Sequence, residues 1–263
     1  MLNLRFGPDE LERVHAQLTN FIAATVHDAG ADGAVLGLSG GIDSTLTAHL
    51  AVDALGPDRV KGLILPSGIT AADNVEDAES VADGLGMAAA TVDIEPIVDA
   101  VVEAYPEATD DQLAVGNARA RIRAVLNYVA ANHENRVVLG TGNRSEAAVG
   151  YFTKYGDGAV DCHPIGDLYK MQVRQLADHV GVREALIEKT PTAELWAEQT
   201  DEDELGVDYD TLDAILALHV DGPLSKAATV RELDCDPSVI DRVVSLNETS
   251  DHKRSMPPSP TIW

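Results

Sequence analysis

Hydrophobic positions along the chain form short apolar runs separated by stretches with helical spacing. The runs predict strands at 33–38 (GAVLGL), 59–65 (RVKGLIL), 88–94 (AAATVDI) and 136–140 (RVVLG). The stretches between them predict helices at 45–55, 72–85 and 117–132. Strands that alternate with helices in this way are typical of βαβ units, so we expect a parallel sheet.

An amphipathic helix is predicted before the first strand, over residues 9–29. Its apolar face recurs every three or four residues and comprises Leu11, Val14, Leu18, Phe21, Ile22 and Thr25. Gly30 can end the helix, because glycine adopts a left-handed cap conformation at little cost. We expect this helix to cover the sheet.

The helix at 117–132 is long enough to present several faces. Its apolar face is expected to hold Ile122, Val125, Leu126 and Val129. Its other faces carry the arginines Arg119, Arg121 and Arg123. In the C-terminal third, acidic loops alternate with short predicted helices at about 208–220, 223–232 and 237–247.

The length of 263 residues and the 45% hydrophobic content allow one full core. We expect a single domain, with an N-terminal helix (1–30), an α/β core (31–170) and a helical region ending in a substrate-binding tail (171–263). No apolar run approaches the ~20 residues that cross a bilayer, and the N-terminus lacks the layout of a signal peptide. We therefore expect a cytoplasmic protein that does not bind membranes. Cys162 and Cys235 lack the spacing of a zinc site or a disulfide framework.

The charge of the chain is strongly negative, with 44 acidic and 19 basic residues and a net charge of −25. This balance opposes binding to nucleic acid, whose phosphates require a basic surface. Salt at ~1 M shortens the Debye length to ~3 Å and would screen the self-repulsion. We expect a protein of a salt-rich cytoplasm, the alternative being an acidic protein of ordinary salt.

The most informative motif joins the first strand to the next helix, in the segment GAVLGLSGGIDS at 33–44. Gly40 and Gly41 let backbone N–H groups approach an anion, and the helix N-terminus adds its positive dipole. The carboxylate of Asp43 would repel a phosphate unless a divalent cation lies between them, which favours ATP with Mg²⁺. A glycine-rich turn with Ser44 as helix cap is the alternative, and no Walker A motif is present.

A second polar segment follows the fourth strand, from Thr141 to Lys170. If the sheet is doubly wound, the first and fourth strands are neighbours at the crevice where ligands bind. Asp43 and Glu146 would then face each other and could share one Mg²⁺, leaving its other positions to water and phosphates.

These motifs resemble those of NAD synthetases, members of the ATP-pyrophosphatase superfamily with an adenine nucleotide alpha hydrolase-like fold. The matching segments run in order along the chain: LSGGIDST (38–45), GNARARIR (116–123), GTGNRSE (140–146), GYFTKYGDGAVD (150–161), HPIGDLYK (163–170), PTAELW (191–196), QTDEDELG (199–206) and HKR (252–254). The resemblance implies a doubly wound parallel five-stranded sheet, with helices on both faces and a helical C-terminal region.

The resemblance also assigns roles to individual residues. ATP binding falls to Gly37, Leu38, Ser39, Gly40, Gly41, Ile42, Asp43, Ser44, Thr141, Lys170 and Thr192. Deamido-NAD⁺ binding falls to Arg121, Lys154, Asp161, His252 and Lys253. Asp43 and Glu146 are the implied Mg²⁺ ligands and, with Asp161, the implied catalytic residues.

The implied reaction is the last step of NAD⁺ biosynthesis, carried out by a ligase that forms a C–N bond. The carboxylate of deamido-NAD⁺ is adenylated by ATP with release of pyrophosphate, and ammonia then displaces AMP. Either Asp161 or water could accept the proton of the ammonia. The resemblance further implies a homodimer, with the N-terminal helix and the helix at 117–132 as candidate contacts.

Two other functions stay open from the residues alone. The SGGxDS loop also occurs in GMP synthetases and thiolating enzymes, although the acidic charge opposes a tRNA substrate. A noncatalytic nucleotide-binding regulator would bind ATP without needing the pair of carboxylates.

Overall fold

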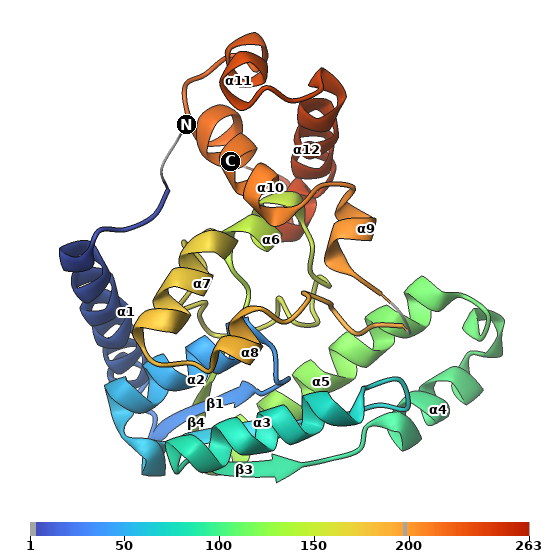
Figure 1. Ribbon diagram of the computed structural model, residues 1–263. Coiled ribbons are helices and arrows are strands. Elements are labelled where there is room, and N and C mark those ends of the chain that lie inside the picture. Colours follow the sequence, from blue (N-terminus) through green and yellow to red (C-terminus); the bar gives the residue numbers. More distant parts are fainter. Residues whose placement is uncertain (1–3, 197–198, 263) are drawn as a thin grey trace.

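The computed structural model describes residues 4–196 and 199–262 (Figure 1). Its strands are β1 (Gly33–Gly37), β2 (Val60–Ile64), β3 (Ala88–Thr91) and β4 (Arg136–Leu139). Its helices are α1 (Pro8–Asp28), α2 (Ile42–Leu55), α3 (Ala72–Leu85), α4 (Glu95–Ala104), α5 (Gln112–Glu134), α6 (Arg144–Val149), α7 (Lys170–His179), α8 (Glu184–Ile187), α9 (Asp201–Leu205), α10 (Tyr209–Ile215), α11 (Lys226–Leu233), α12 (Pro237–Thr249) and α13 (Asp251–Arg254). Short helical turns lie at Pro57–Arg59, Pro106–Ala108 and Leu216–Val220.

The strands form one parallel sheet in the order β3-β2-β1-β4, which confirms the expected parallel arrangement. The chain leaves β1 toward β2 and later returns to the other side of β1 as β4. The order therefore reverses beside β1, and the carboxyl ends of β1 and β4 lie next to each other. This crevice is where the two polar motifs meet.

The expectation of five strands is wrong for the described residues, whose sheet has four. The chain passes β4 again at Cys162 but makes only an isolated parallel bridge with Leu139. Gly140 N donates to Cys162 O over 2.8 Å, and Asp161 N donates to Val138 O over 3.0 Å. The Asp161 carboxylate accepts a hydrogen bond from the backbone N–H of Val138. A side chain therefore occupies the position where a fifth strand would continue the backbone hydrogen bonds.

Alternate residues of the strands point to opposite faces of the sheet, and each face has its own core. Ala34 and Leu36 belong to a core shared with α1, α2, α3 and α7, whereas Val35 belongs to a core shared with α4 and α5. Figure 1 shows α2 and α3 on one side of the strands and α5 on the other. Both faces are covered, which explains why the central strands are almost wholly apolar.

Two details of the predicted helix faces are wrong. Phe21 of α1 is 44% exposed, and Val125 and Val129 of α5 are 61% and 59% exposed. Helix α5 packs on the sheet through Ile122 and along a second side through small residues, where a Cβ on Gly116 would contact Leu195. Small residues let the neighbouring segment approach this side of α5 closely, so this side is buried. Val125 and Val129 lie on the opposite, outer side of the helix.

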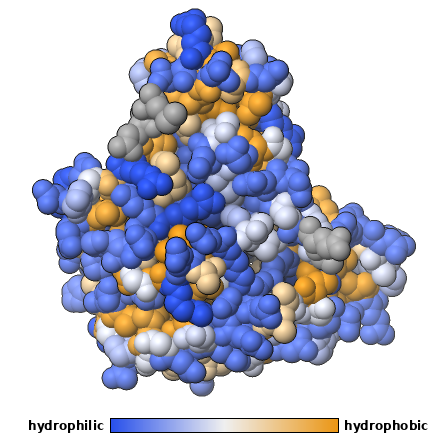
Figure 2. Space-filling view, viewed as in Figure 1, coloured by the Kyte–Doolittle hydropathy of each residue, from blue (hydrophilic) through white to orange (hydrophobic). Residues whose placement is uncertain are grey.

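The C-terminal helices build a separate core around the fully buried Tyr209. Helices α6, α9, α10 and α12 contribute to this core, and Figure 1 shows them grouped above the sheet in the view. Figure 2 shows that hydrophilic side chains cover most of the face in view. In the part of the chain that the structure describes, no helix combines the length and apolarity needed to cross a membrane.

Candidate active site

The conformation of the loop after β1 depends on its glycines and on its serine hydroxyls. Gly40 has φ +75°, and a Cβ there would overlap the carbonyl oxygen of Asn74. Ser44 Oγ donates to Gly41 O over 3.0 Å and accepts from Ser39 N over 3.2 Å. Helix α2 begins directly after this loop, so its N–H groups and dipole favour an anion there.

Lys170 joins the two carboxylates that the sequence analysis paired. Its Nζ lies 2.5 Å from Asp43 Oδ2 and 3.1 Å from Glu146 Oε1. The lysine side chain is only 3% exposed, while those of Asp43 and Glu146 are 18% and 17% exposed. Lys170, Asp43 and Glu146 lie in the first turns of α7, α2 and α6, so three helix N-termini bring these charges to the crevice.

Asn143 is a further member of the site that the sequence analysis missed. It is fully buried, its Nδ2 donates to Asp43 Oδ1 over 2.9 Å, and its Oδ1 accepts from Glu146 N over 3.0 Å. The same side chain therefore caps α6 and orients Asp43. An asparagine followed three residues later by glutamate is a helix-start signal that could have identified it.

Tyr209 and Asp201 extend the site toward the C-terminal helices. Tyr209 Oη donates to Asp201 Oδ2 over 2.8 Å and lies 3.4 Å from Glu146 Oε1, with its ring centroid 4.9 Å from Lys170 Nζ. Asp201 is 4% exposed, and its Oδ1 has no hydrogen-bond partner among the described residues. In the sequence, Asp201 stands in a run of acidic residues and has the pattern of a solvated loop.

Burial governs the electrostatics of this cluster. Burial, more than the charge of Asp43, raises the pKa of Glu146 to about 7, although Lys170 opposes the shift. Burial also raises the pKa of Asp201 above its usual range. For Lys170, burial acts to lower the pKa, but the charges of Asp43 and Glu146 outweigh it and the pKa is raised. One ammonium thus faces several carboxylates, and the site favours additional positive charge.

The residues present fit a magnesium ion bound together with a substrate phosphate. Oxygens of Asp43 and Glu146 converge on one position, which the Lys170 ammonium occupies. Among the described residues, no three His, Cys, Asp or Glu side chains form a ready metal cage. Mg²⁺ is commonly held by one or two carboxylates, with phosphates and water supplying the other ligands.

The start of α7 is fixed by a buried hydrogen-bonded group. Ser145 Oγ donates to Asp213 Oδ1 and accepts from Lys170 N over 2.9 Å, while Asp213 Oδ2 accepts from Met171 N over 2.9 Å. Burial raises the pKa of Asp213 to about 6. These contacts fix the backbone from which Lys170 reaches the carboxylate pair.

Asp161 makes its hydrogen bonds away from this cluster, at the edge of the sheet. Its Oδ2 accepts from Val138 N over 2.7 Å, and its Oδ1 accepts from Tyr128 Oη over 3.1 Å. Burial and the nearby Asp161 charge raise the pKa of Tyr128 to about 12. No recorded contact within the described residues joins Asp161 to Asp43 or Glu146, and its predicted catalytic role stays a prediction.

The residues predicted to bind deamido-NAD⁺ lie on three parts of the chain: Arg121 on α5, Lys154 and Asp161 on the segment between α6 and α7, and His252 and Lys253 on the C-terminal tail. Lys154 Nζ donates to the carbonyl oxygen of His252, and Lys253 Nζ donates to Gly150 O over 2.7 Å and to Phe152 O over 2.9 Å. These hydrogen bonds attach the C-terminal tail to the loop that follows α6. Arg121 lies exposed on the outer side of α5.

The two threonines predicted to contact ATP lie on different loops. Thr141 is partly buried directly after β4, beside the crevice. Thr192 accepts a hydrogen bond at Oγ1 from Glu194 N over 3.2 Å, within the loop between α8 and α9. Their predicted contacts with ATP stay predictions.

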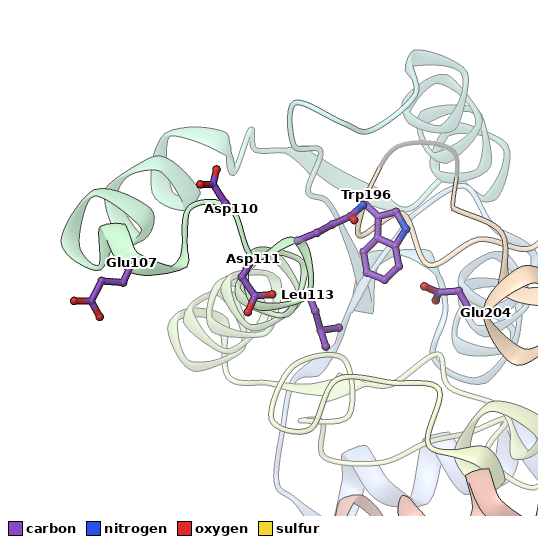
Figure 3. A pocket seen from close by; sticks show the side chains of 7 residues that line it. Glu107, Asp110, Asp111, Leu113, Trp196 and Glu204 are labelled. Atoms are coloured by element: carbon purple, nitrogen blue, oxygen red, sulfur yellow. The ribbon is translucent and has the colours of Figure 1, made fainter.

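A cavity of about 760 Å³ lies between the start of α5 and α9 (Figure 3). It is lined by Glu107, Asp110, Asp111, Gln112, Leu113, Trp196 and Glu204. Four carboxylates repel a polyphosphate, so this cavity does not suit the triphosphate of ATP.

The doubly wound sheet, the glycine loop and the paired carboxylates define an α/β protein of the nucleotide-binding class, with its candidate site at the switch point of the sheet. The chain belongs to the NAD synthase family, whose model matches residues 14–257. This membership confirms the resemblance that the motifs indicated, and with it the expectation of an ATP-using ligase.

Several curated relatives match over nearly their whole length. An NH(3)-dependent NAD(+) synthetase from Halobacterium salinarum is 58% identical over 259 residues, which are 98% of this chain and 97% of the relative. The NH(3)-dependent NAD(+) synthetase from Archaeoglobus fulgidus is 48% identical, over 94% of this chain and 96% of the relative.

Solved structures of similar proteins share the fold. The NMN synthetase from Francisella tularensis has a TM-score of 0.84 at 35% identity, covering 98% of this chain and 100% of that chain. The NH3-dependent NAD synthetase from Campylobacter jejuni, in complex with a nitrate ion, has a TM-score of 0.80 at 31% identity, covering 95% of this chain and 99% of that chain.

Proposed function

We propose that this protein converts deamido-NAD⁺ to NAD⁺ with ATP and ammonia, releasing AMP and pyrophosphate. The observation that carries the proposal is the meeting of Asp43, Glu146 and Lys170 beside an anion-binding loop. Such a site neutralises the charge of a triphosphate while an acid is activated. Family membership and the names of the similar relatives supply the acid and the amine.

In the first step, an oxygen of the nicotinate carboxylate attacks the α-phosphorus of ATP, and the bond to the β-phosphate oxygen breaks. The products are an acyl-adenylate and pyrophosphate. Loop N–H groups and the Lys170 ammonium stabilise the charge on the phosphates, so positioning and electrostatics supply the catalysis. Asp43 and Glu146 would hold Mg²⁺, which adds positive charge at the leaving phosphates.

In the second step, ammonia attacks the activated carbonyl carbon, AMP leaves with the bonding electrons, and the new amide loses one proton. We assign the acceptor role to Asp201 rather than Asp161. Asp201 is joined to Glu146 through Tyr209, and its Oδ1 has no hydrogen-bond partner among the described residues, whereas both oxygens of Asp161 accept hydrogen bonds. Its raised pKa, caused mainly by burial, also favours taking up a proton.

A homodimer is part of the proposal. Arg121, Val125 and Val129 recur at four-residue spacing along the outer side of α5, and both valines are more than half exposed. Two valines in the open beside an arginine form a surface that a second copy could cover. Val129→Asp should then shift sedimentation of the protein from dimer to monomer, and a wild-type monomer would refute the assignment.

The reaction is tested with purified protein in concentrated KCl, by measuring AMP and NAD⁺ formed from ATP, ammonia and deamido-NAD⁺ with and without Mg²⁺. Product formation should require Mg²⁺. Asp43→Asn should retain nucleotide binding while turnover falls by about 100-fold, in the range for losing one charge-stabilising group. Absence of product from the wild-type protein would reject the proposal.

A second acceptor deserves a parallel assay, because the Francisella tularensis structure is named as an NMN synthetase. Nicotinate mononucleotide replaces deamido-NAD⁺ in an otherwise identical reaction. Higher kcat/KM with the mononucleotide would change the substrate but leave the assigned chemistry intact.

A further inference from the structure

Lys189 follows α8 and contacts the phosphate loop from outside. Its Nζ donates to Asp77 Oδ2 on α3 over 2.7 Å and to the carbonyl oxygen of Gly40 over 3.3 Å. The lysine and Asp77 side chains are 27% and 26% exposed. A half-buried cation therefore touches a backbone atom of the loop that we assign to ATP.

Gly40 can be positioned only through its backbone, because it has no side chain to pack. Its φ of +75° and its close approach to Asn74 and Asp77 leave no space for a Cβ. The loop is thus seated directly against α3. The hydrogen bond from Lys189 constrains the direction of the Gly40 carbonyl.

The direction of that carbonyl determines where the next N–H points. The Gly40 C=O and the Gly41 N–H belong to one trans peptide unit, so they point in opposite directions. With the carbonyl directed toward Lys189, the Gly41 N–H faces the interior of the loop, where its hydrogen bond to Ser39 Oγ is long, at 3.3 Å. Gly41 is also the N-cap of α2, where an anion meets the helix dipole.

We infer that Lys189 is a positioning residue for ATP, because it orients the Gly40–Gly41 peptide so that the Gly41 N–H faces the phosphates. The inference deepens the proposed function and rests on it, since it takes the loop as the phosphate site. Asp77 holds the lysine in place. The hydrogen bond from Lys189 contributes most to keeping the pKa of Asp77 below its usual range.

Arg183 provides a matched control for this inference. Its Nη2 donates to Asp77 Oδ1 over 3.0 Å, so it binds the same carboxylate from the same chain segment. Of these two cations, only Lys189 has a recorded contact with Gly40 in the described part of the chain. Loss of Arg183 should weaken the attachment to α3 without releasing the peptide plane.

The test compares Lys189→Met, Lys189→Arg and Arg183→Met. Calorimetry measures binding of a nonhydrolysable ATP analogue, steady-state assays give KM for ATP and for deamido-NAD⁺, and thermal unfolding without nucleotide reports the structural effect. Lys189→Met should weaken analogue binding and raise KM for ATP by roughly tenfold, as for one lost hydrogen bond to a charged group. KM for deamido-NAD⁺ should change less than about twofold, Lys189→Arg should restore most of the ATP affinity, and Arg183→Met should bind ATP normally.

Equal analogue binding by Lys189→Met and Arg183→Met would overturn the inference, as would equal increases in KM for both substrates. Normal analogue binding by the wild-type protein without AMP formation would instead overturn the proposed function. The two failures are therefore distinguishable.

Discussion

Replacing Lys170 by methionine tests the physical basis of the site. The change removes the ammonium that lies 2.5 Å from Asp43 and 3.1 Å from Glu146, in a position that is only 3% exposed. Removing one partner of a buried ion pair costs about 3–5 kcal/mol, and the partial exposure of the two carboxylates places this case near 3 kcal/mol. In Mg²⁺-free buffer at pH 8, the free energy of unfolding should fall by about that amount.

The loss should depend on pH in a defined direction. Burial already raises the pKa of Glu146 to about 7, above its unfolded value, and Lys170 opposes that shift. Without the lysine the folded pKa rises further, so the protonated carboxyl is retained at pH 6 and the variant is destabilised less than at pH 8. The destabilisation therefore grows as the pH rises through the folded pKa. Added Mg²⁺ should recover part of the lost stability, because a divalent cation replaces the missing charge.

Urea unfolding at constant high KCl measures both effects. Lys226→Met is the control, because Lys226 also pairs with a carboxylate at 2.5 Å but is 40% exposed, and a surface pair contributes only about 0–1 kcal/mol. Equal losses in the two variants, or a Lys170→Met protein as stable as the wild type at pH 8, would refute the reasoning.

Three further predictions concern the acidic residues. Asp201→Asn should lower kcat by about 100-fold with little change in KM for ATP, whereas Asp161→Asn should mainly reduce the free energy of unfolding. Steady-state kinetics and urea unfolding of both variants test this. The reverse pattern would return the proton-acceptor role to Asp161. Burial raises the folded pKa of Asp213 to about 6, so the wild-type protein loses stability as this carboxyl ionises with rising pH. Asp213→Asn should therefore gain stability relative to the wild type between about pH 4 and 6. A difference in stability that does not depend on pH would contradict this. With a net charge of −25, the protein should unfold at higher urea concentrations in molar KCl than in dilute KCl, and a flat salt series would reject the adaptation to high salt.

The order of strands and helices was readable from local patterns. The alternation of apolar runs and helical stretches predicted a parallel sheet, and the structure has β1, β2, β3 and β4 within the predicted ranges. Helix α4 was missed, and the outer side of α5 was misjudged. Periodicity identifies an apolar stripe, but the neighbours that cover it decide which stripe is buried.

The paired carboxylates were predictable because they stand at the carboxyl ends of strands that a doubly wound topology makes adjacent. Asn143 had a local signal, since it caps α6 three residues before Glu146. Tyr209 and Lys189 had none. Each acts through a partner far along the chain, Glu146 being 63 residues from Tyr209 and Gly40 being 149 residues from Lys189.

The sequence by itself determined the class of fold, the glycine loop after β1 and the family, because backbone preferences and short motifs act over a few residues. Only the tertiary structure decided that Lys170, 127 residues from Asp43, holds the acidic pair, and that Asp161 is engaged at the edge of the sheet. The physical reason is that burial and charge depend on which distant elements meet. A carboxylate in a loop has the same local pattern whether it faces water, a backbone N–H or a buried ammonium.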